Sequence, residues 1–445
     1  MATRQIISKS INVASGDYIG RDGELWVDTV TNTMKISDGT TPGGATLTTD
    51  GAGAGATAWA AITNINNANG PDNIAVGNSA GFTNQGTYGI ALGFGAGDTN
   101  QGIAAVGIGY TAGLTSQGAS AIAIGQNAGN TTQGIDAVAI GVQAGLTTQG
   151  QSSVAIGQDA GQATQGANAV AIGTSAGQTT QGGYAVAVGQ QAGKTTQGAS
   201  AVAVGTSAGK TTQGDYAVAV GISSGETTQG DYAVALGYNA GTTSQGDEAT
   251  AVGDSAGKTN QGANATAVGD SAGKTTQGAS AVAVGQQAGE TTQGASAVAV
   301  GVEAGKTTQK GLAVAVGYRA GYTTQGIGAV AIGHDTGKTT QSNSAVAIGP
   351  YAGETTQGTN SVALGNSAGK TSQGAEAVAI GRQAGETNQA ANSIVINATG
   401  AVLNNIVEDV FIVKPVRGVA GATLPAGFKQ VAYNPTTGEF IYYDM

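Results

Sequence analysis

A 16-residue repeat runs through most of this chain without an insertion or a deletion. The glycine that ends each "AVAVG"-type string recurs every 16 residues from Gly77 to Gly381, which makes twenty copies. Counted from this glycine as position 0, position +4 is glycine and position +8 is glutamine in all twenty copies. A repeat this short cannot bury a core of its own, so neighbouring copies must stack on one another.

The stretch before the zero glycine has the pattern of a β-strand. Positions −3 and −1 are almost always Val, Ile or Leu, as at Val202 and Val204, and positions −4 and −2 are nearly always Ala. A four-residue alternation with β-branched residues is typical of a strand and is too short for a helix. Because both faces of this strand are apolar, we expect it to be covered on both sides.

After the zero glycine comes a short run of small residues such as "TSAG", followed by "KTTQG". Position +9 is glycine in seventeen copies; the exceptions are Lys310, Ser342 and Ala390. Glycines at +4 and +9 predict corners, where the backbone needs a positive φ or passes close to a neighbour. Each repeat is therefore predicted to be one coil made of a strand, a corner, a short Thr-rich strand and a second corner.

Stacked coils would bring identical side chains into register, with Gln above Gln and Thr above Thr, as in side-chain ladders along a cross-β stack. The residues that we take to represent this structural ladder are Gln117, Gln133, Gln149, Gln213, Gly205, Gly209, Gly214, Val202 and Val204. Small side chains let two strands approach closely, so we expect Ala inside the coil, although Val and Ile inside is an open alternative. Either arrangement leaves an apolar stripe outside, which needs a partner, and identical chains around an axis are the simplest one.

Composition and charge exclude several classes of protein. The net charge of −10 opposes binding of nucleic acid, which needs a basic face. The chain has no cysteine, and therefore no disulfide framework or thiolate metal site. It has no run of 18 apolar residues, so we predict no membrane insertion. The opening "MATRQIISKS" lacks the apolar core of a secretory signal, so we expect synthesis in a cytoplasm without a common export address.

One string resembles a phosphate-binding loop but fails its spacing. In "VGTSAGKTTQG", residues 204–214, the glycines Gly205 and Gly209 are separated by three residues, whereas such a loop needs four. Other copies carry Phe82, Glu226 or Tyr322 at the position of the lysine, so that lysine cannot be essential. We predict no nucleotide and no other cofactor.

Two pairs of carboxylates could in principle serve glycoside hydrolysis, which needs two acids about 5–10 Å apart. They are Asp247 with Glu248, and Asp254 with Asp270. No insertion in these copies could build a pocket around them, and no acidic loop recurs with calcium-ligand spacing. The single histidine, His334, is predicted to be a surface residue. The sequence thus predicts no enzyme, no catalytic residue and no metal site.

At "SAVAVGTSAG" and its copies, residues 73–397 resemble the head repeats of trimeric autotransporter adhesins, the YadA-like family. The resemblance implies an all-β fold: a left-handed parallel β-roll, or β-solenoid, of about twenty 16-residue coils, with three identical chains side by side. The longer "GxTTQG" corner and the fixed 16-residue period depart from that family. A signal peptide, a coiled-coil stalk and a membrane barrel are not recognised, which puts bacterial surface display in doubt.

The two ends resemble a different group of proteins, the fibres of tailed bacteriophages. Residues 1–50 resemble their small β-rich N-terminal module, with short strands expected in "GELWVDT" and "NTMKISDG" and a core of Trp26, Val27 and Met34. Residues 51–72 form a Gly/Ala-rich linker, 73–397 the repeat shaft and 398–445 a C-terminal β cap or tip. In the tip, "FKQVAYNPTTGEFIYYDM" predicts a hairpin. In some phage fibres a self-cleaving chaperone domain follows this segment.

Together the resemblances imply a structural fibre of a bacteriophage virion, on the tail or the head. It would be a rigid homotrimeric rod, fixed to a virion component by its N-terminus and touching a host-surface glycan or protein. The predicted receptor contacts are Tyr433, Phe440, Tyr442 and Tyr443, with Tyr216, Tyr232, Tyr318 and Tyr322 as further exposed candidates.

Two alternative functions are a bacterial surface adhesin and an ice-binding solenoid. The latter rests on the Thr columns at +6 and +7. Adjacent strand residues point to opposite faces, so we expect only one of these columns to face ice.

Overall fold

The computed structural model describes residues 25–28, 33–37, 40, 45–46, 72–415, 430–434 and 439–443. This described part is entirely β: a parallel β-solenoid of about 21 turns without a helix, which confirms the predicted β-solenoid. The chain forms two compact units, Met1–Tyr184 and Ala185–Met445. The same 16-residue coil is found in both units.

The first unit begins with a small antiparallel sheet. Its strands are β1 (Leu25–Asp28), β2 (Thr33–Ile36) and β3 (Ala45–Thr46), paired in that order. β1 and β2 lie in the two segments in which the sequence predicted strands. The side chains of Trp26, Val27 and Met34, which we expected to form a small core, lie outside the described part.

From residue 72 onward the first unit is a stack of coils, each contributing a three-residue strand before the zero glycine. These strands are β4 (Ile74–Val76), β5 (Ile90–Leu92), β6 (Val106–Ile108), β8 (Ile122–Ile124), β10 (Val138–Ile140), β12 (Val154–Ile156) and β14 (Val170–Ile172). A second row of two-residue strands ends at each glutamine: β7 (Ser116–Gln117), β9 (Thr132–Gln133), β11 (Thr148–Gln149), β13 (Thr164–Gln165) and β15 (Thr180–Gln181).

The second unit repeats this arrangement. Its three-residue strands are β16 (Val186–Val188), β18 (Val202–Val204), β20 (Val218–Val220), β22 (Val234–Leu236), β24 (Thr250–Val252), β26 (Thr266–Val268), β28 (Val282–Val284), β30 (Val298–Val300), β32 (Val314–Val316), β34 (Val330–Ile332), β36 (Val346–Ile348), β38 (Val362–Leu364) and β40 (Val378–Ile380). Its two-residue strands are β17 (Thr196–Gln197), β19 (Thr212–Gln213), β21 (Thr228–Gln229), β23 (Ser244–Gln245), β25 (Asn260–Gln261), β27 (Thr276–Gln277), β29 (Thr292–Gln293), β31 (Thr308–Gln309), β33 (Thr324–Gln325), β35 (Thr340–Gln341), β37 (Thr356–Gln357) and β39 (Ser372–Gln373).

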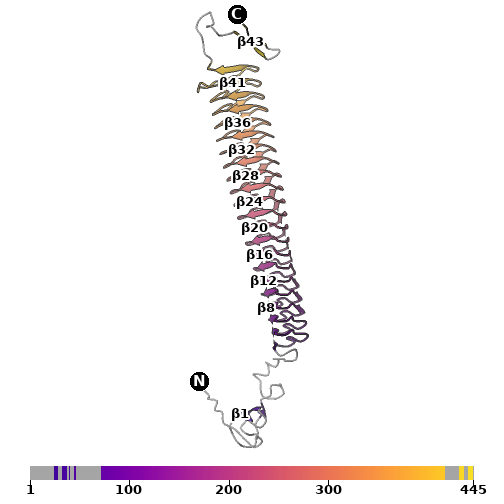
Figure 1. Cartoon of the computed structure of the whole chain (residues 1–445). Coiled ribbons are helices and arrows are strands. Elements are labelled where there is room, and N and C mark those ends of the chain that lie inside the picture. The colour runs from indigo at the N-terminus through magenta and orange to yellow at the C-terminus, as the bar shows by residue number, and fades with distance from the viewer. Residues whose placement is uncertain are drawn as a thin grey trace, which may run out of the picture. The chain divides into compact units, whose positions relative to one another are not determined.

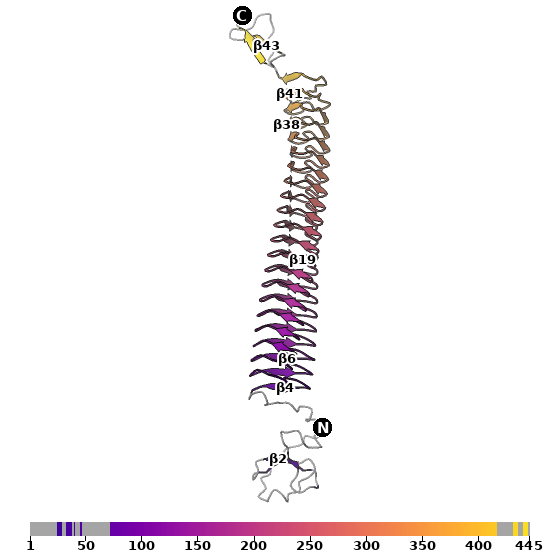
Figure 2. The ribbon, with the colours of Figure 1, turned by 90° about the vertical axis from the view of Figure 1, so that its right-hand side faces the viewer.

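The strands of each row pair in parallel with a register of one repeat. Ala203 of β18 lies opposite Ala219 of β20, and Gln213 of β19 lies opposite Gln229 of β21. Each strand therefore bonds only to the strands of the coils before and after it, and within each unit the coils follow one another as a ladder of arrows (Figures 1 and 2). The predicted coil of strand, corner, short Thr-rich strand and corner is confirmed.

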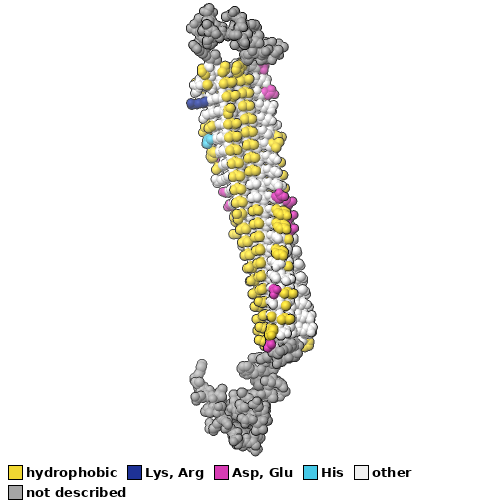
Figure 3. All heavy atoms as spheres, viewed as in Figure 1, with side chains coloured by type: hydrophobic (Ala, Val, Ile, Leu, Met, Phe, Trp, Pro, Cys, Tyr) yellow, Lys and Arg dark blue, Asp and Glu magenta, His cyan; other side chains and the backbone are white. Residues whose placement is uncertain are grey.

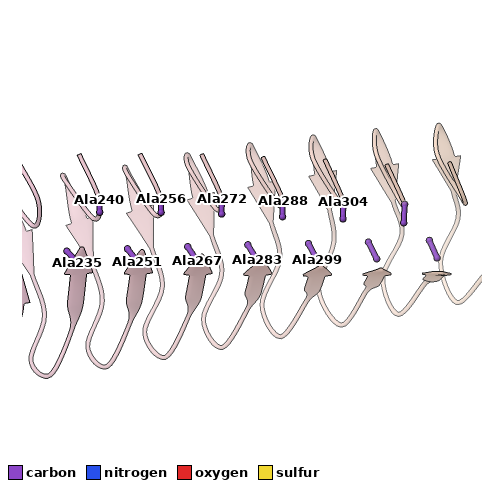
Figure 4. Close-up of a cluster of buried hydrophobic side chains, with 13 residues drawn as sticks. Ala235, Ala240, Ala251, Ala256, Ala267, Ala272, Ala283, Ala288, Ala299 and Ala304 are labelled. Carbon is purple, nitrogen blue, oxygen red and sulfur yellow. The ribbon is translucent and has the colours of Figure 1, made fainter. Parts of the chain in front are cut away.

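The interior of the coil is lined by small side chains and by glutamine. Alanines at −4, −2 and +3, such as Ala203 and Ala208, are completely buried, and Gln213 is 1% exposed. The alanines of facing segments point toward one another across each coil, as they do for Ala235 and Ala240 (Figure 4). The structure thus decides the question that the sequence left open, because Ala faces inward and the Val and Ile columns face outward.

The three kinds of repeated glycine occupy backbone positions of different geometry. Gly205, at position 0, has a φ of 128°, and a Cβ there would lie 2.6 Å from the carbonyl oxygen of Gly221. Gly209, at +4, has a φ of 53°, and its Cβ would lie 2.7 Å from Oε1 of Gln213. Gly214, at +9, does not have a positive φ, but its Cβ would lie 2.6 Å from the amide nitrogen of Asp231. Both predicted reasons for these corners, a positive φ and a close backbone approach, therefore occur.

The corners also contain left-handed residues that are not glycine, at +2 and five residues before the zero glycine. Ser207 and Tyr216 have φ values of 59° and 58°. The sequence did not predict these positions, because a wide range of side chains occupies them. Backbone bonds to the neighbouring coil hold them in place: the amides of Ser207 and Tyr216 donate to the carbonyls of Gln190 and Ala199 at 2.9 Å.

The parallel stack continues past residue 397, where we had placed the end of the shaft. β41 (Ile394–Asn397) pairs with β40 and with β42 (Phe411–Lys414), a strand 17 residues further along the chain. The C-terminal segment contains the predicted hairpin, formed by β43 (Gln430–Asn434) and β44 (Glu439–Tyr443).

The glycine geometry predicts a sharp difference between two Gly-to-Ala substitutions. We expect Gly205→Ala to destabilise its coil by about 2–4 kcal/mol, since the new Cβ meets a backbone carbonyl and an unfavourable φ. The matched control is Gly311→Ala, where the nearest atom would lie 3.2 Å away and other copies carry alanine. The measurement is the opening free energy from hydrogen exchange, and equal values for the two variants would contradict this account.

Candidate functional site

A column of buried glutamines crosses the interior of the coils. Nε2 of Gln213 donates to the carbonyl of Val202 on the facing strand at 2.8 Å and to that of Ala217 at 3.2 Å. It also donates to Oε1 of the next glutamine, Gln229, at 3.2 Å. The side chain therefore ties the short strand to the alanine-lined strand within a coil and to the coil that follows.

The predicted column of stacked glutamines is present, although its side-chain bonds are interrupted in places. Gln117, Gln133 and Gln149 are all buried, and each donates to the facing strand at 2.7 Å. Oε1 of Gln133 and of Gln149 has no hydrogen-bond partner among the described atoms, so the Gln-to-Gln bond is not continuous. The glutamine bond to a backbone carbonyl of the facing strand is shorter and more regular than the bond between glutamines. The narrow coil places that strand within reach of the side-chain amide.

The outward faces of the three-residue strands carry the columns of Val, Ile and Leu. Val202 and Val204 are half-buried, and larger residues in the same columns protrude further, with Leu236 45% exposed. In Figure 3 hydrophobic side chains gather in columns along the stacked coils. Contiguous apolar surface of this extent is typical of an interface. We call it the Val/Ile face.

The short Thr-Gln strands lie on the other side of each coil. At most of the coils both Thr columns, at +6 and +7, are exposed, as at Thr211 and Thr212. Both columns are therefore open to solvent, and the expectation that only one of them could face ice stays a prediction. The strand begins only at +7, so the residue at +6 still belongs to the corner, where the alternation of a strand does not apply.

The charged side chains lie mainly on the corner that follows the zero glycine, at +1, +2 and +5, which we call the first edge. Residues 72–184 contain no Lys or Arg, and the first cation of the repeats is Lys194. Ion pairs between consecutive coils follow, including Lys210–Glu226 at 3.4 Å and Lys370–Glu354 at 3.7 Å. Ion pairs near the surface contribute little to stability. The stability of the solenoid therefore does not depend on these side chains.

Around Glu303 the first edge carries a denser network. Its carboxylate accepts from Nζ of Lys306 and Nε of Arg319, both at 2.7 Å. The hydrogen bond from Lys306, followed by that from Arg319, holds the pKa of Glu303 below its ordinary value of 4.5. The guanidinium of Arg319 lies 4.8 Å from the ring centre of Tyr318 and 5.7 Å from that of Tyr322.

The network continues into the next two coils. His334 stacks on Tyr318 with ring centres 5.1 Å apart, and meets Tyr351 edge-on at 5.2 Å. Nζ of Lys338 lies 3.3 Å from the carboxylate of Asp335, which is almost fully buried. His334 is on the surface as predicted, with its side chain 47% exposed. Sequence analysis missed the cluster, although consecutive copies carry large or charged residues at +2 where small ones are usual.

The corner before the three-residue strand, the second edge, is acidic. Asp215, Asp231 and Asp247 form a column in which each carboxylate accepts from the backbone amide one repeat earlier, at 2.8–3.1 Å. Tyr216 and Tyr232 stack beside them with ring centres 5.0 Å apart. These carboxylates complete backbone hydrogen bonding, which is a structural role.

The two candidate carboxylate pairs lie on different edges of the coil, Asp247 and Glu248 on the second edge and Asp254 and Asp270 on the first. Asp254 and Asp270 lie on the first edge and accept from the hydroxyls of Ser255 and Ser271 at 2.8 and 2.9 Å. Within the described ranges, no group of three or more His, Cys, Asp or Glu side chains could hold a metal ion. A hollow of ≈ 300 Å³ lies instead over the second row of strands, lined by Ser244, Gln245, Gly246, Asn260, Gln261, Gly262, Ala263, Thr276 and Gln277.

The predicted receptor contacts at the C-terminus lie in the β43–β44 hairpin. The register places Tyr433 opposite Phe440, Val431 opposite Tyr442 and Gln430 opposite Tyr443. The four residues therefore belong to one hairpin. Their role in receptor binding stays a prediction.

No protein-family model, curated protein or solved structure matches the chain. In the part of the chain that the structure describes, no helix could cross a membrane.

The ion pairs around Glu303 predict that the pKa of its carboxyl is lowered in the folded chain. A carboxyl whose pKa is lowered in the folded state contributes stability above its unfolded pKa, and loses it as the pH falls through the folded-state pKa. We expect the Glu303 carboxyl to titrate below 4.5 in carbon-detected NMR, and to return toward that value in a Lys306→Gln/Arg319→Gln variant. A midpoint at 4.5 in the unchanged chain would mean that the ion pairs do not persist in solution.

Proposed function

We propose that the chain is a structural fibre of a bacteriophage virion, built as a homotrimeric left-handed β-roll that mediates adhesion to the host surface. The observation that carries the proposal is the Val/Ile face. The described coils bury mainly alanine and glutamine, so the Val, Ile and Leu side chains of their three-residue strands remain on the outside. A soluble chain with such a surface needs a partner, and a second and third copy provide the same face at the same height.

The repeat also explains why a fibre would use this fold. Every coil bonds only to its neighbours, so length grows by adding copies without redesigning a core. Parallel copies present each exposed site several times, and several weak contacts held together bind more strongly than one. The segments beyond the solenoid support attachment at one end and contact at the other, through their resemblance to phage fibre modules.

Ice binding is the second candidate, because both Thr columns are exposed on most coils. The +7 column is interrupted by Asn or Ser in seven of the twenty copies, among them Asn84, Ser116 and Asn260, which breaks the regular array that would order water. A thermal-hysteresis assay distinguishes this candidate from the fibre.

Substitutions on the Val/Ile face test the assembly. In Val268→Lys/Val284→Lys, two cations would be placed in the apolar contact between copies, at a cost of several kcal/mol. We expect this variant to dissociate at least tenfold more readily than the unchanged chain in sedimentation equilibrium, with its β spectrum retained. The matched control is Thr276→Lys/Thr292→Lys, in the same two coils but on the exposed opposite side. Equal assembly of the two variants would exclude the Val/Ile face as the interface.

The virion itself tests the biological setting. Antibodies against the C-terminal hairpin, viewed by electron microscopy of phage particles, should label the outer ends of fibres. A particle preparation that contains none of the chain by mass spectrometry would refute the virion assignment.

A further inference from the structure

We propose that the first edge between residues 303 and 351 is a lateral binding site for a carboxylate-bearing saccharide, with the Arg319 guanidinium as its anchor. The inference deepens the proposed adhesion function and rests on it, because it locates a host-glycan contact on the side of the solenoid. The site comprises Tyr318, Arg319, Tyr322, His334 and Tyr351, with Glu303 and Asp335 as supporting acids.

The other copies of the repeat show that this cluster is not needed for folding. At +2, where Glu303, Arg319, Asp335 and Tyr351 follow one another, most other copies carry Ser, Asn or Gln and form the same coil. Large side chains cost more conformational entropy to order than small ones. Their concentration in a few consecutive coils therefore needs a reason other than the stability of the solenoid.

The contacts around Arg319 hold its guanidinium in place but leave part of it unused. Nε donates to Glu303 at 2.7 Å, and the rings of Tyr318 and Tyr322 lie against the guanidinium. Among the described residues, this is the one hydrogen bond that the side chain donates, so the Nη groups are available, and the side chain is 36% exposed. A guanidinium fixed in this way is suited to a bidentate pair of hydrogen bonds with a carboxylate.

Cations gather at this point of an acidic chain. Arg319 pairs with Glu303 and Lys338 with Asp335, whereas Lys306 lies between Glu303 at 2.7 Å and Glu290 at 3.8 Å. The local charges are balanced, so the open edge of the Arg319 guanidinium is what would attract an anion. The rings of Tyr318 and His334 stack along the edge, one coil apart. The Tyr318 hydroxyl and the His334 imidazole can form hydrogen bonds to the hydroxyls of an extended sugar chain.

The backbone of this edge argues against a peptide bound as an added strand. Strand addition to a free sheet edge is one common way in which a peptide is recognised. Here the amides are already used between coils: that of Arg319 donates to Val302 at 3.0 Å, and that of Asp335 donates to Tyr318 at 2.9 Å. Recognition must therefore come from side chains spaced one coil apart, which fits a polymer of repeating acidic sugars.

The test uses the full chain and isothermal titration with four probes. They are a hexamer of guluronate, a tetramer of sialic acid, a carboxyl-reduced guluronate hexamer and hexa-L-glutamate. We expect at least one acidic saccharide to bind no less than tenfold more tightly than the reduced form and the peptide. Binding of neither acidic saccharide overturns the proposal. Equal binding of the peptide also overturns it, in favour of a protein partner.

Two conservative variants provide the matched comparison. Arg319→Lys keeps the charge but loses the planar fork, and we expect it to weaken binding at least tenfold. Arg382→Lys, the same change at the other arginine of the described residues, should alter binding less than twofold. In the unchanged chain, the saccharide should protect Arg319 but not Arg382 from phenylglyoxal. Equal effects at the two arginines would refute the site.

The saccharide-binding test can fail while the proposed fibre assembly still holds. Arg319→Lys lies outside the Val/Ile face, so its assembly mass and melting temperature should equal those of the unchanged chain. A chain that assembles as proposed but binds neither acidic saccharide would remove the lateral site and leave the fibre standing.

Discussion

A buried amide spans the coil in each repeat, and the rest of the architecture depends on it. The glutamine at +8 reaches from the short strand to a carbonyl of the facing strand, as Gln293 does to Val282 at 2.7 Å. This bond sets a short distance between the two walls, which leaves room only for small side chains between them, mostly alanine. It also accounts for the glycine at +4, since a Cβ on Gly289 would lie 2.9 Å from Oε1 of Gln293.

Because the interior of the coil is thin, the larger apolar side chains lie on its outer face. Alanine buries little apolar surface, and the burial of larger side chains supplies most of the stabilisation in an ordinary domain. Here those larger side chains, such as Val282 and Val284, lie on the outer face and are only half-buried. The single chain therefore leaves much of its hydrophobic surface in contact with water, and association of copies would recover it. The edges are under less constraint, and it is there that the copies differ.

The sequence predicted the parts of the fold that are set by repetition. The 16-residue period, the strand at Val202–Val204 and the corners at Gly205 and Gly209 all follow from residues that recur in every copy. The left-handed conformation at Ser207 was not predicted, because backbone bonds between coils impose it and the side chain does not. The carbonyl partners of the glutamines could not be predicted either, since they depend on the distance between two walls.

The site at Arg319 was not predicted for a different reason. Positions that vary between copies are usually solvent-exposed, and each aromatic or charged residue there is unremarkable alone. Only the coil geometry shows that residues 16 positions apart, such as Glu303 and Arg319, are direct neighbours. A scan of each column for runs of large residues would have found the cluster.

The most direct test of the central claim is the opening free energy of a coil without its glutamine. Replacing Gln293 by leucine keeps a side chain in the interior but removes the bonds to the facing strand and to Gln309. Hydrogen exchange should show the surrounding coils destabilised by about 2–3 kcal/mol. Gln286→Leu, at an exposed position of the same coil, should change little. Equal protection in the two variants would contradict the account, because the buried amide would then not be what holds the coil together.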